Sequence, residues 1–324
     1  MPRPSIAVVA PLTGPRAVWG AVLLSRVDQV RSTFPDAAEW HVHDETPGAA
    51  DAVVRAGHTA IVGHSDADGA RRALPLYRAA GLPCLLPFVR AGAPALSWAL
   101  DDHALARTIV EGAVSLGAEA LTVTHDQGAH WAMLAHKVAS AATAAGLAQR
   151  PGGLPAVLAP QERFGRFVRG PGPVLAPVDC GLVSFGALAG QADGREVWAV
   201  HPQVCAVRRA RTALTALAQA LQADPALRGT ALTEAVRAHS GAMLAAGGGI
   251  LGDSWQVSRL GSVCPAREGD WPRGPQGCCA SGGTRRAGCP PTTDISRQTR
   301  SSTDALLGAD DHTRTSVTQP TGMA

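Results

Sequence analysis

Histidine and carboxylate side chains, which can bind metals or move protons, occur close together at two places in the chain. The first group is His41, His43 and Asp44, and the second is His64, Asp66 and Asp68. Two histidines separated by one residue on a β-strand place both imidazole rings on the same face. A zinc site needs at least three protein ligands, and the sequence identifies no third ligand to join these two histidines. We therefore expect no bound metal and no cofactor.

Two catalytic signatures are missing. The glycine run at 247–249 is followed by Ile250, not by the Lys-Ser/Thr of a phosphate-binding P-loop. No Gly-x-Ser-x-Gly nucleophile elbow occurs. The sequence favours a protein that is not an enzyme. A metal-assisted enzyme on a Rossmann-like fold, using the His and Asp groups, stays open as an alternative.

The composition excludes two further classes of protein. Of the 324 residues, 46% are hydrophobic and 17% are charged, and the formal net charge is +3. This near-neutral balance argues against a polybasic nucleic-acid binder, so we expect no nucleic-acid partner. No run of about 18 apolar residues occurs, so we expect no membrane span.

The first residues argue against an export signal. A short apolar run at 6–10 follows Met1 almost at once and ends at Pro11. A secretory signal needs a basic segment and then an apolar segment of about 7–15 residues, so this run is instead typical of a buried first strand. We expect a cytoplasmic protein. An exported or cell-surface location is the alternative if a leader precedes Met1.

Apolar runs alternate with longer Ala/Leu-rich segments as far as about residue 261, which predicts an α/β fold with mainly parallel sheets flanked by helices. Predicted strands cover 6–10, 40–43, 60–63, 82–87, 120–124, 174–178, 197–200 and 255–257. Predicted helices cover 18–34, 49–56, 67–80, 103–116, 130–145, 208–221 and 230–240. The Gly- and Pro-rich stretch 164–173 is expected to be a loop.

The last part of the chain, 262–324, loses this periodicity and is predicted to be a disordered tail. It contains Cys264, Cys278, Cys279 and Cys289. These cysteines lack a C-x₂-C pair, which argues against zinc. A tail translated from a shifted reading frame is another interpretation. The three remaining cysteines, at 84, 180 and 205, are expected to be reduced core residues.

Three segments together resemble the type I periplasmic binding proteins, most closely the branched-chain amino-acid (Leu/Ile/Val) group of ABC-transporter substrate-binding proteins. The first is the strand and loop of 6–20, with Thr13-Gly14-Pro15 and Trp19-Gly20. The second is 61–65 followed by 73–87. The third is 122–126 followed by His130 and Trp131.

The resemblance implies a two-lobed clamshell with a ligand between the lobes, at the carboxyl ends of the strands. Lobe 1 is expected at 1–98 and 201–241, and lobe 2 at 99–200 and 242–261. The short stretch 186–195 indicates that the usual helix of lobe 2 is trimmed. Closure around the ligand would be a hinge motion.

The resemblance also implies a set of ligand-binding residues, drawn from loops of both lobes. They are Trp19, Ser65, Asp68, Phe88, Val89, Arg90, His130, Trp131, Ser184, Phe185 and Gln203. Trp19 would form an apolar wall, and Ser65 would bind a carboxylate. Asp66 and Asp68 would repel a carboxylate, and helix capping is the other interpretation for them. Gln203 falls where the family places an acid for the ligand ammonium.

The expected function is therefore non-catalytic binding of a small polar ligand, an amino acid or a related small anion. An ABC permease is the expected partner if the protein is exported. Without a leader, the protein would act as a cytoplasmic sensor. A decayed binding protein that now serves as an interaction or regulatory module is a further alternative.

Overall fold

The computed structural model describes residues 3–14, 16–168, 171–192, 194–240 and 255–260. The chain divides into two compact units, 1–292 and 293–324, and all described residues belong to the first. The predicted disordered tail and its four cysteines lie outside the described residues.

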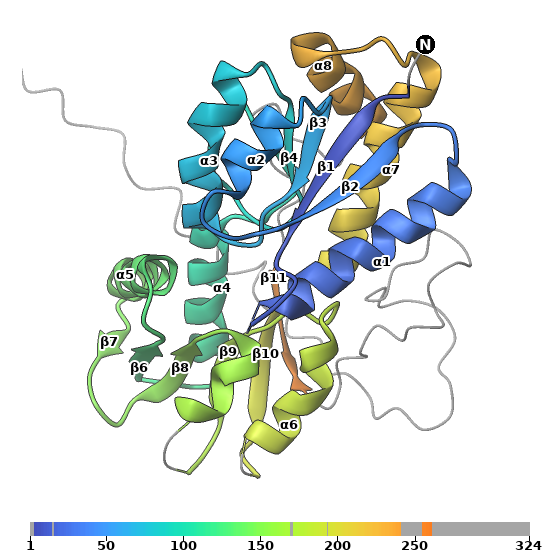
Figure 1. Cartoon of the computed structure of the whole chain (residues 1–324). Coiled ribbons are helices and arrows are strands. Elements are labelled where there is room, and N and C mark those ends of the chain that lie inside the picture. The colour runs from blue at the N-terminus through green and yellow to red at the C-terminus, as the bar shows by residue number, and fades with distance from the viewer. Residues whose placement is uncertain (1–2, 15, 169–170, 193, 241–254, 261–324) are drawn as a thin grey trace, which may run out of the picture. The chain divides into compact units, whose positions relative to one another are not determined.

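The first sheet contains five strands in the order β2-β1-β3-β4-β5, and every pair is parallel (Figure 1). The strands are β1 (Ser5–Ala10), β2 (Glu39–Asp44), β3 (Ala60–Gly63), β4 (Cys84–Leu86) and β5 (Leu96–Ser97). β1 lies inside the sheet and is buried over five of its six residues. Such a continuous apolar run is typical of a parallel strand covered on both faces.

Helices cover both faces of the first sheet. Ile6 and Val8 of β1 pack in a cluster with α1 (Ala17–Thr33), α7 (Ala206–Ala223) and α8 (Gly229–His239). Ala7 and Val9 face the other way, toward α2 (Ala49–Arg55) and α3 (Ala67–Ala79). Figure 1 shows α2 and α3 on one side of this sheet and α1 and α7 on the other. The period of two along β1 therefore sets both layers.

The second sheet contains six strands in the order β11-β10-β9-β8-β6-β7. They are β6 (Ala120–His125), β7 (Ala148–Gln149), β8 (Leu154–Leu158), β9 (Val174–Pro177), β10 (Val197–Pro202) and β11 (Trp255–Arg259). All pairs are parallel except β10 with β11, which is antiparallel. Its helices are α4 (Asp102–Ser115), α5 (Ala129–Ala144) and α6 (Leu188–Gln191), with 3₁₀ turns η1 (Gln161–Arg166) and η2 (Val183–Ala187).

The predicted strands and helices are confirmed, with boundaries shifted by a few residues. The expected loop at 164–173 is wrong at its start, because 164–166 belongs to η1. The strands β5, β7 and β8 were not predicted. β5 and β7 have only two residues each, and β8 contains Pro155, which argues against a strand when only the sequence is known. The short α6, of four residues, agrees with the trimmed helix expected there.

Two further expectations concern single features of the chain. Cys84, Cys180 and Cys205 are buried, as expected for core residues. Among the described residues, no helix is both long enough and apolar enough to cross a membrane. The residue ranges assigned to the two lobes stay a prediction.

Candidate functional site

The carboxyl ends of β2 and β3 bring together two segments that lie about twenty residues apart in the chain. β2 ends at Asp44 and is followed by Glu45, whose N–H donates to Ala10 O of β1 at 3.0 Å. β3 ends at Gly63 and is followed by His64 and Ser65, just before α3 begins. Ligands of open α/β sheets bind outside this end of the strands, so the contacts made there decide what the sheet offers a ligand.

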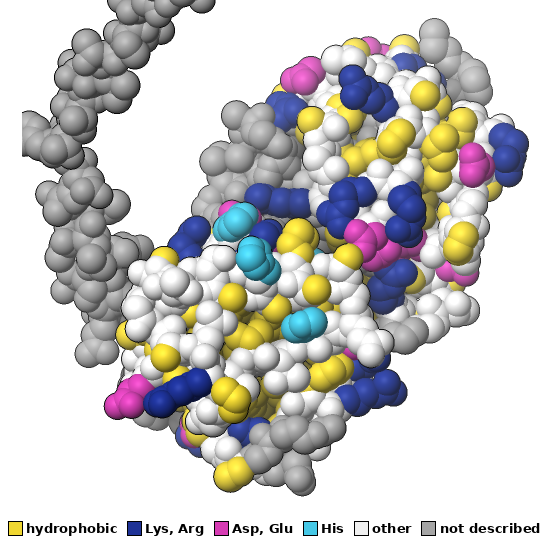
Figure 2. All heavy atoms as spheres, turned by 90° about the vertical axis from the view of Figure 1, so that its left-hand side faces the viewer, with side chains coloured by type: hydrophobic (Ala, Val, Ile, Leu, Met, Phe, Trp, Pro, Cys, Tyr) yellow, Lys and Arg dark blue, Asp and Glu magenta, His cyan; other side chains and the backbone are white. Residues whose placement is uncertain are grey.

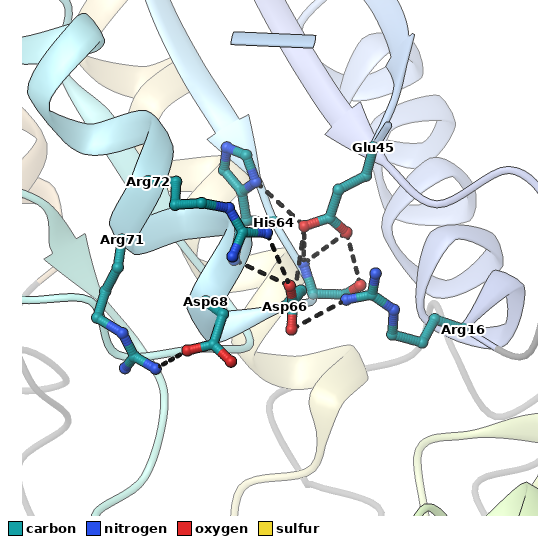
Figure 3. A network of polar contacts seen from close by, with 9 residues as sticks. Arg16, Glu45, His64, Asp66, Asp68, Arg71 and Arg72 are labelled. Carbon is teal, nitrogen blue, oxygen red and sulfur yellow. Dashed lines mark hydrogen bonds and ion pairs between the residues drawn. The ribbon is translucent and has the colours of Figure 1, made fainter. Parts of the chain in front are cut away.

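The Glu45 carboxylate lies buried among donors from the β3–α3 loop (Figure 3). It accepts hydrogen bonds from the Ser65 N–H at 3.1 and 3.0 Å and from the Ser65 hydroxyl at 2.7 Å. The Asp66 N–H adds a bond of 3.3 Å, and His64 Nδ1 lies at 3.1 Å. Only 6% of the Glu45 side chain is exposed. The Ser65 hydroxyl therefore donates its proton to Glu45 and has none left to donate to a ligand.

His64 holds an unusual backbone conformation to reach Glu45. Its φ of 62° is the only positive φ of a non-glycine residue in the described part of the chain. Such strain persists only where surrounding contacts fix it. His64 Nε2 lies 3.1 Å from the Tyr77 hydroxyl. A carboxylate only accepts, so Nδ1 must carry the proton shared with Glu45.

Gly63 makes this turn possible. Its φ is 147°, and a Cβ there would lie 2.0 Å from the Val9 carbonyl oxygen of the neighbouring strand. A side chain at this position would push β3 away from β1. The sequence Gly63-His64 therefore fixes the direction in which the imidazole points.

The electrostatics of this cluster favour an ionised Glu45. Burial raises the pKa of Glu45, but hydrogen bonds from His64 and Ser65 and the charge interaction with His64 outweigh it, and the pKa ends below its ordinary value. Burial raises the pKa of Tyr77 and lifts that of the Cys84 thiol to about 12. Both groups stay protonated near neutral pH. The cluster supplies a fixed, satisfied anion and no exposed nucleophile.

Arginine side chains surround the acids at the start of α3 (Figure 3). The Asp66 carboxylate caps this helix by accepting from the Gly69 N–H at 2.9 Å, which confirms the capping interpretation for that residue. It also lies 3.3 Å from Arg16 and 3.9 Å from Arg72. Figure 2, which faces the side where α3 and α5 lie in Figure 1, shows basic and acidic side chains gathered together. Asp68 pairs with Arg71 in this group.

Trp19 and Phe88, both candidates from the sequence, lie together. Their rings meet edge to face with centroids 5.1 Å apart. Phe88 is buried, while Trp19 and Val89 are partly buried and pack against the core. These aromatic rings come from α1 and from the segment after β4, so they offer an apolar surface beside the first sheet.

Arg90 is tied to the segment that leads into α4. Its Nε donates to the Ala99 carbonyl oxygen at 3.1 Å, and its Nη1 lies 3.8 Å from Asp101. Asp101 in turn caps α4 through the His103 N–H at 3.0 Å. The guanidinium thus contacts the chain where it passes from the first sheet to the second.

The candidates of the second sheet fall into two separate groups. His130 and Trp131 stack edge to face at 5.0 Å, and His130 lies 3.9 Å from Asp102 of α4. Ser184 accepts from Gln161 and donates to Glu162, each at 2.7 Å. Phe185 is buried in the core, and Gln203 is exposed. A contact of Phe185 with a ligand stays a prediction, and so does a contact of Gln203 with a ligand ammonium group.

Sequence reasoning missed a buried ion pair, Asp179 with Arg209. Asp179 follows β9, and its carboxylate accepts from the Gly181 N–H at 2.8 Å and from the Ala206 N–H at 3.0 Å. Arg209 Nη2 of α7 donates to it at 2.6 Å. Burial raises the pKa of Asp179, and Arg209 and the two N–H groups offset this only in part.

A signal for this pair was present in the sequence. Arg209 lies on the buried stripe of α7, in helical register with Ala213 and Ala216. A cation on an apolar stripe requires a buried partner. The partner itself comes from a strand thirty residues earlier and cannot be found from helical periodicity.

The two histidine groups do not form a metal centre in the part of the chain that the structure describes. There, no three or more His, Cys, Asp or Glu side chains are arranged to hold an ion. His43 Nε2 instead lies 3.0 Å from Nε2 of His58, a residue that the sequence did not single out. His58 Nδ1 lies 2.7 Å from the Ser5 hydroxyl. His64 is taken up by Glu45 and Tyr77.

Two surface hollows lie at the other end of the strands. One, of about 610 Å³, is lined by residues at the end of α1 and the start of β2, including Trp40 and Glu39. The other, of about 390 Å³, is lined by residues at the start of β6 and β8, including Glu119 and Arg150. Neither contains a candidate ligand-binding residue.

Comparisons with known proteins identify the fold. No protein-family model and no curated protein sequence matches the chain. A solved leucine binding protein from Thermotoga maritima is 15% identical, with a TM-score of 0.59 over 79% of this chain and 95% of its own. An extracellular ligand-binding receptor from Rhodopseudomonas palustris is 12% identical, with a TM-score of 0.60 over 79% and 97%.

A branched-chain amino-acid transporter substrate-binding protein from Streptococcus pneumoniae, solved with isoleucine, is 11% identical, with a TM-score of 0.56 over 79% and 96%. The chain therefore has the two-lobed α/β fold of the type I periplasmic binding proteins, as its sequence resemblance predicts. One of these structural neighbours is described as a transporter substrate-binding protein, and the other two as a leucine binding protein and a ligand-binding receptor.

Proposed function

We propose that this protein binds a small polar ligand, such as an amino acid or a related small molecule, without catalysing a reaction. The ligand would lie between the two lobes, at the carboxyl ends of the strands. The observation that carries the proposal is the fold, which it shares with solved proteins described as leucine binding and as bound to isoleucine.

The residues of the first sheet support this proposal. Trp19 and Phe88 join two segments in one aromatic contact beside the carboxyl ends of the strands. Small-ligand sites combine such apolar walls with a few placed polar groups. In this proposal, Trp19 packs against the ligand and Arg90, half exposed at the crossing between sheets, contacts its polar end.

The partner depends on where the protein works. An exported form would deliver its ligand to an ABC permease, in keeping with the transporter binding proteins that share the fold. A cytoplasmic form would act as a sensor. Expression of the natural gene followed by fractionation of cells distinguishes these settings.

Calorimetric titration of the full chain with the amino acids and a panel of small polar molecules tests the proposal. We expect one class of ligand to bind with a Kd in the range of about micromolar to millimolar. Trp19→Ala should weaken that binding by about tenfold or more, because it removes the apolar wall. Trp40→Ala is the matched control, because Trp40 lies at the amino end of β2, away from the carboxyl ends of the strands. This variant should leave binding unchanged. No binding by the folded chain at millimolar ligand would contradict the proposal and favour a decayed binding protein.

A further inference from the structure

Four donors that follow the carboxyl end of β3 are already occupied by the chain itself. The Glu45 carboxylate collects the Ser65 N–H, the Ser65 hydroxyl, the Asp66 N–H and the His64 imidazole, with its side chain 6% exposed. A carboxylate has about four lone-pair sites, so these donors saturate it. The same donors would otherwise suit a carboxylate arriving from outside.

Glu45 does more than cap α3. That helix already has its own cap, because Asp66 accepts from the Gly69 N–H. The donors that Glu45 holds belong to the cap residue Asp66 and to the two residues before it, and Glu45 follows a different strand, β2. The left-handed backbone conformation of His64 places its ring beside Glu45, so the imidazole also contacts this carboxylate.

The second sheet repeats the arrangement. α7 begins after Cys205, which makes no side-chain capping bond, and the Ala206 N–H donates to Asp179 instead. Asp179 comes from the carboxyl end of β9 and is also bound by Arg209. In both sheets, donors beside a helix start are thus bound by a carboxylate from elsewhere in the chain.

We propose that Glu45 sets the charge that a ligand can present to the first sheet, by occupying the donors that a ligand carboxylate would need. This inference rests on the proposed function. A carboxylate that approached Ser65 would find the Ser65 N–H and hydroxyl and the Asp66 N–H already bound to Glu45, and would meet a like charge within a few ångströms. The ligand is therefore one that meets this loop with a neutral or cationic group, such as an amide or an amine.

The first experiment needs no knowledge of the natural ligand. The Glu45→Ala chain is titrated with sodium acetate, with sodium chloride as the salt control, by calorimetry and by thermal unfolding. We expect acetate to bind with a Kd of about millimolar and to raise the melting temperature of this variant. The wild-type chain and Glu39→Ala, which removes an exposed glutamate of β2, the strand before Glu45, should show no acetate effect beyond that of chloride.

The second experiment uses matched ligands. Leucinamide, which lacks a carboxylate, should bind the wild-type chain at least about tenfold more tightly than leucine, and Glu45→Ala should reverse this preference. A loss of structural support alone would weaken both ligands equally. Tighter binding of leucine by the wild-type chain would overturn the inference and leave the proposed function standing.

Two further outcomes also decide the matter. A folded Glu45→Ala chain that ignores acetate would contradict the role of Glu45. A variant that stays unfolded even at high acetate would count against it too, because the added anion fails to replace the side chain. If no compound of any charge binds the wild-type chain while acetate still fills the variant, the proposed function fails and the occupied site remains.

Discussion

Glu45 and Asp179 are both buried carboxylates, but different groups surround them. Each carboxylate follows a strand end and accepts N–H groups, Glu45 from the loop before α3 and Asp179 from the first residue of α7. Glu45 is held by hydrogen bonds and an imidazole, and its pKa falls. Asp179 is buried against a guanidinium, and its pKa rises because burial dominates. Both carboxylates accept backbone N–H groups, so the opposite pKa directions show which influence dominates: the donors outweigh burial at Glu45, and burial outweighs the donors and Arg209 at Asp179.

Asp179 differs from Glu45 in that its partner is a buried cation. Asp179 and Arg209 are both almost fully buried, with side chains 7% and 6% exposed. Their attraction must offset the desolvation of both groups. Glu45 is instead surrounded by backbone N–H groups and the Ser65 hydroxyl, which carry no net charge, and by the His64 imidazole.

The largest effect is expected from breaking the ion pair. Arg209→Met leaves Asp179 buried without its cation and should lower the free energy of unfolding by about 3–5 kcal/mol. Urea denaturation measures this loss. The double variant Asp179→Leu/Arg209→Met should recover most of this loss. Equal losses in the single and double variants would show that the loss does not come from leaving the Asp179 charge without its cation.

Removal of the Glu45 charge should have a smaller effect. Glu45→Gln should lower the free energy of unfolding by about 1–3 kcal/mol at neutral pH, since an amide cannot accept from every donor. The folded pKa of Glu45 is depressed, so its stabilisation is present above the unfolded value of 4.5 and is lost as the pH falls through the folded pKa. Denaturation curves of both chains should therefore converge on acidification, and a constant gap would contradict the electrostatic origin.

The histidines behind β2 provide a third, weaker test. Burial lowers the pKa of His43 and of His58, and the neighbouring histidines lower both pKa values further. Below pH 6.5, the unfolded pKa of histidine, the unfolded chain binds more protons than the folded chain. The free energy of unfolding should therefore fall as the pH drops from 6.5 through the folded pKa values. His58→Gln should flatten this dependence between neutral and mildly acidic pH. An unchanged slope would rule out the histidine contact as its cause.

The smallest effect is expected at the exposed rim of the first site. Arg71→Ala removes the partner of Asp68, and both side chains are substantially exposed. Surface ion pairs contribute about 0–1 kcal/mol, so the melting temperature should change little. A loss as large as that of Glu45→Gln would show that the rim, rather than the buried carboxylate, supports the loop.

The sequence predicts the sheets well and the polar contacts poorly. Buried strands such as β1 and amphipathic helices such as α7 follow from local periodicity. The place of Ser65 in the loop after β3 is predicted as well, through resemblance to the family. Glu45 and Asp179 escape notice because their partners come from other strands, and no spacing in the sequence reports a contact between segments twenty or thirty residues apart.

The core has a consequence for how the protein melts. One continuous cluster of buried apolar side chains includes Ile6 of the first sheet, Leu217 of α7, and Val174 and Val178 at the second sheet. Neither sheet can lose its packing without exposing part of the same cluster. Heat should therefore unfold the described region in one cooperative transition, with equal calorimetric and van 't Hoff enthalpies.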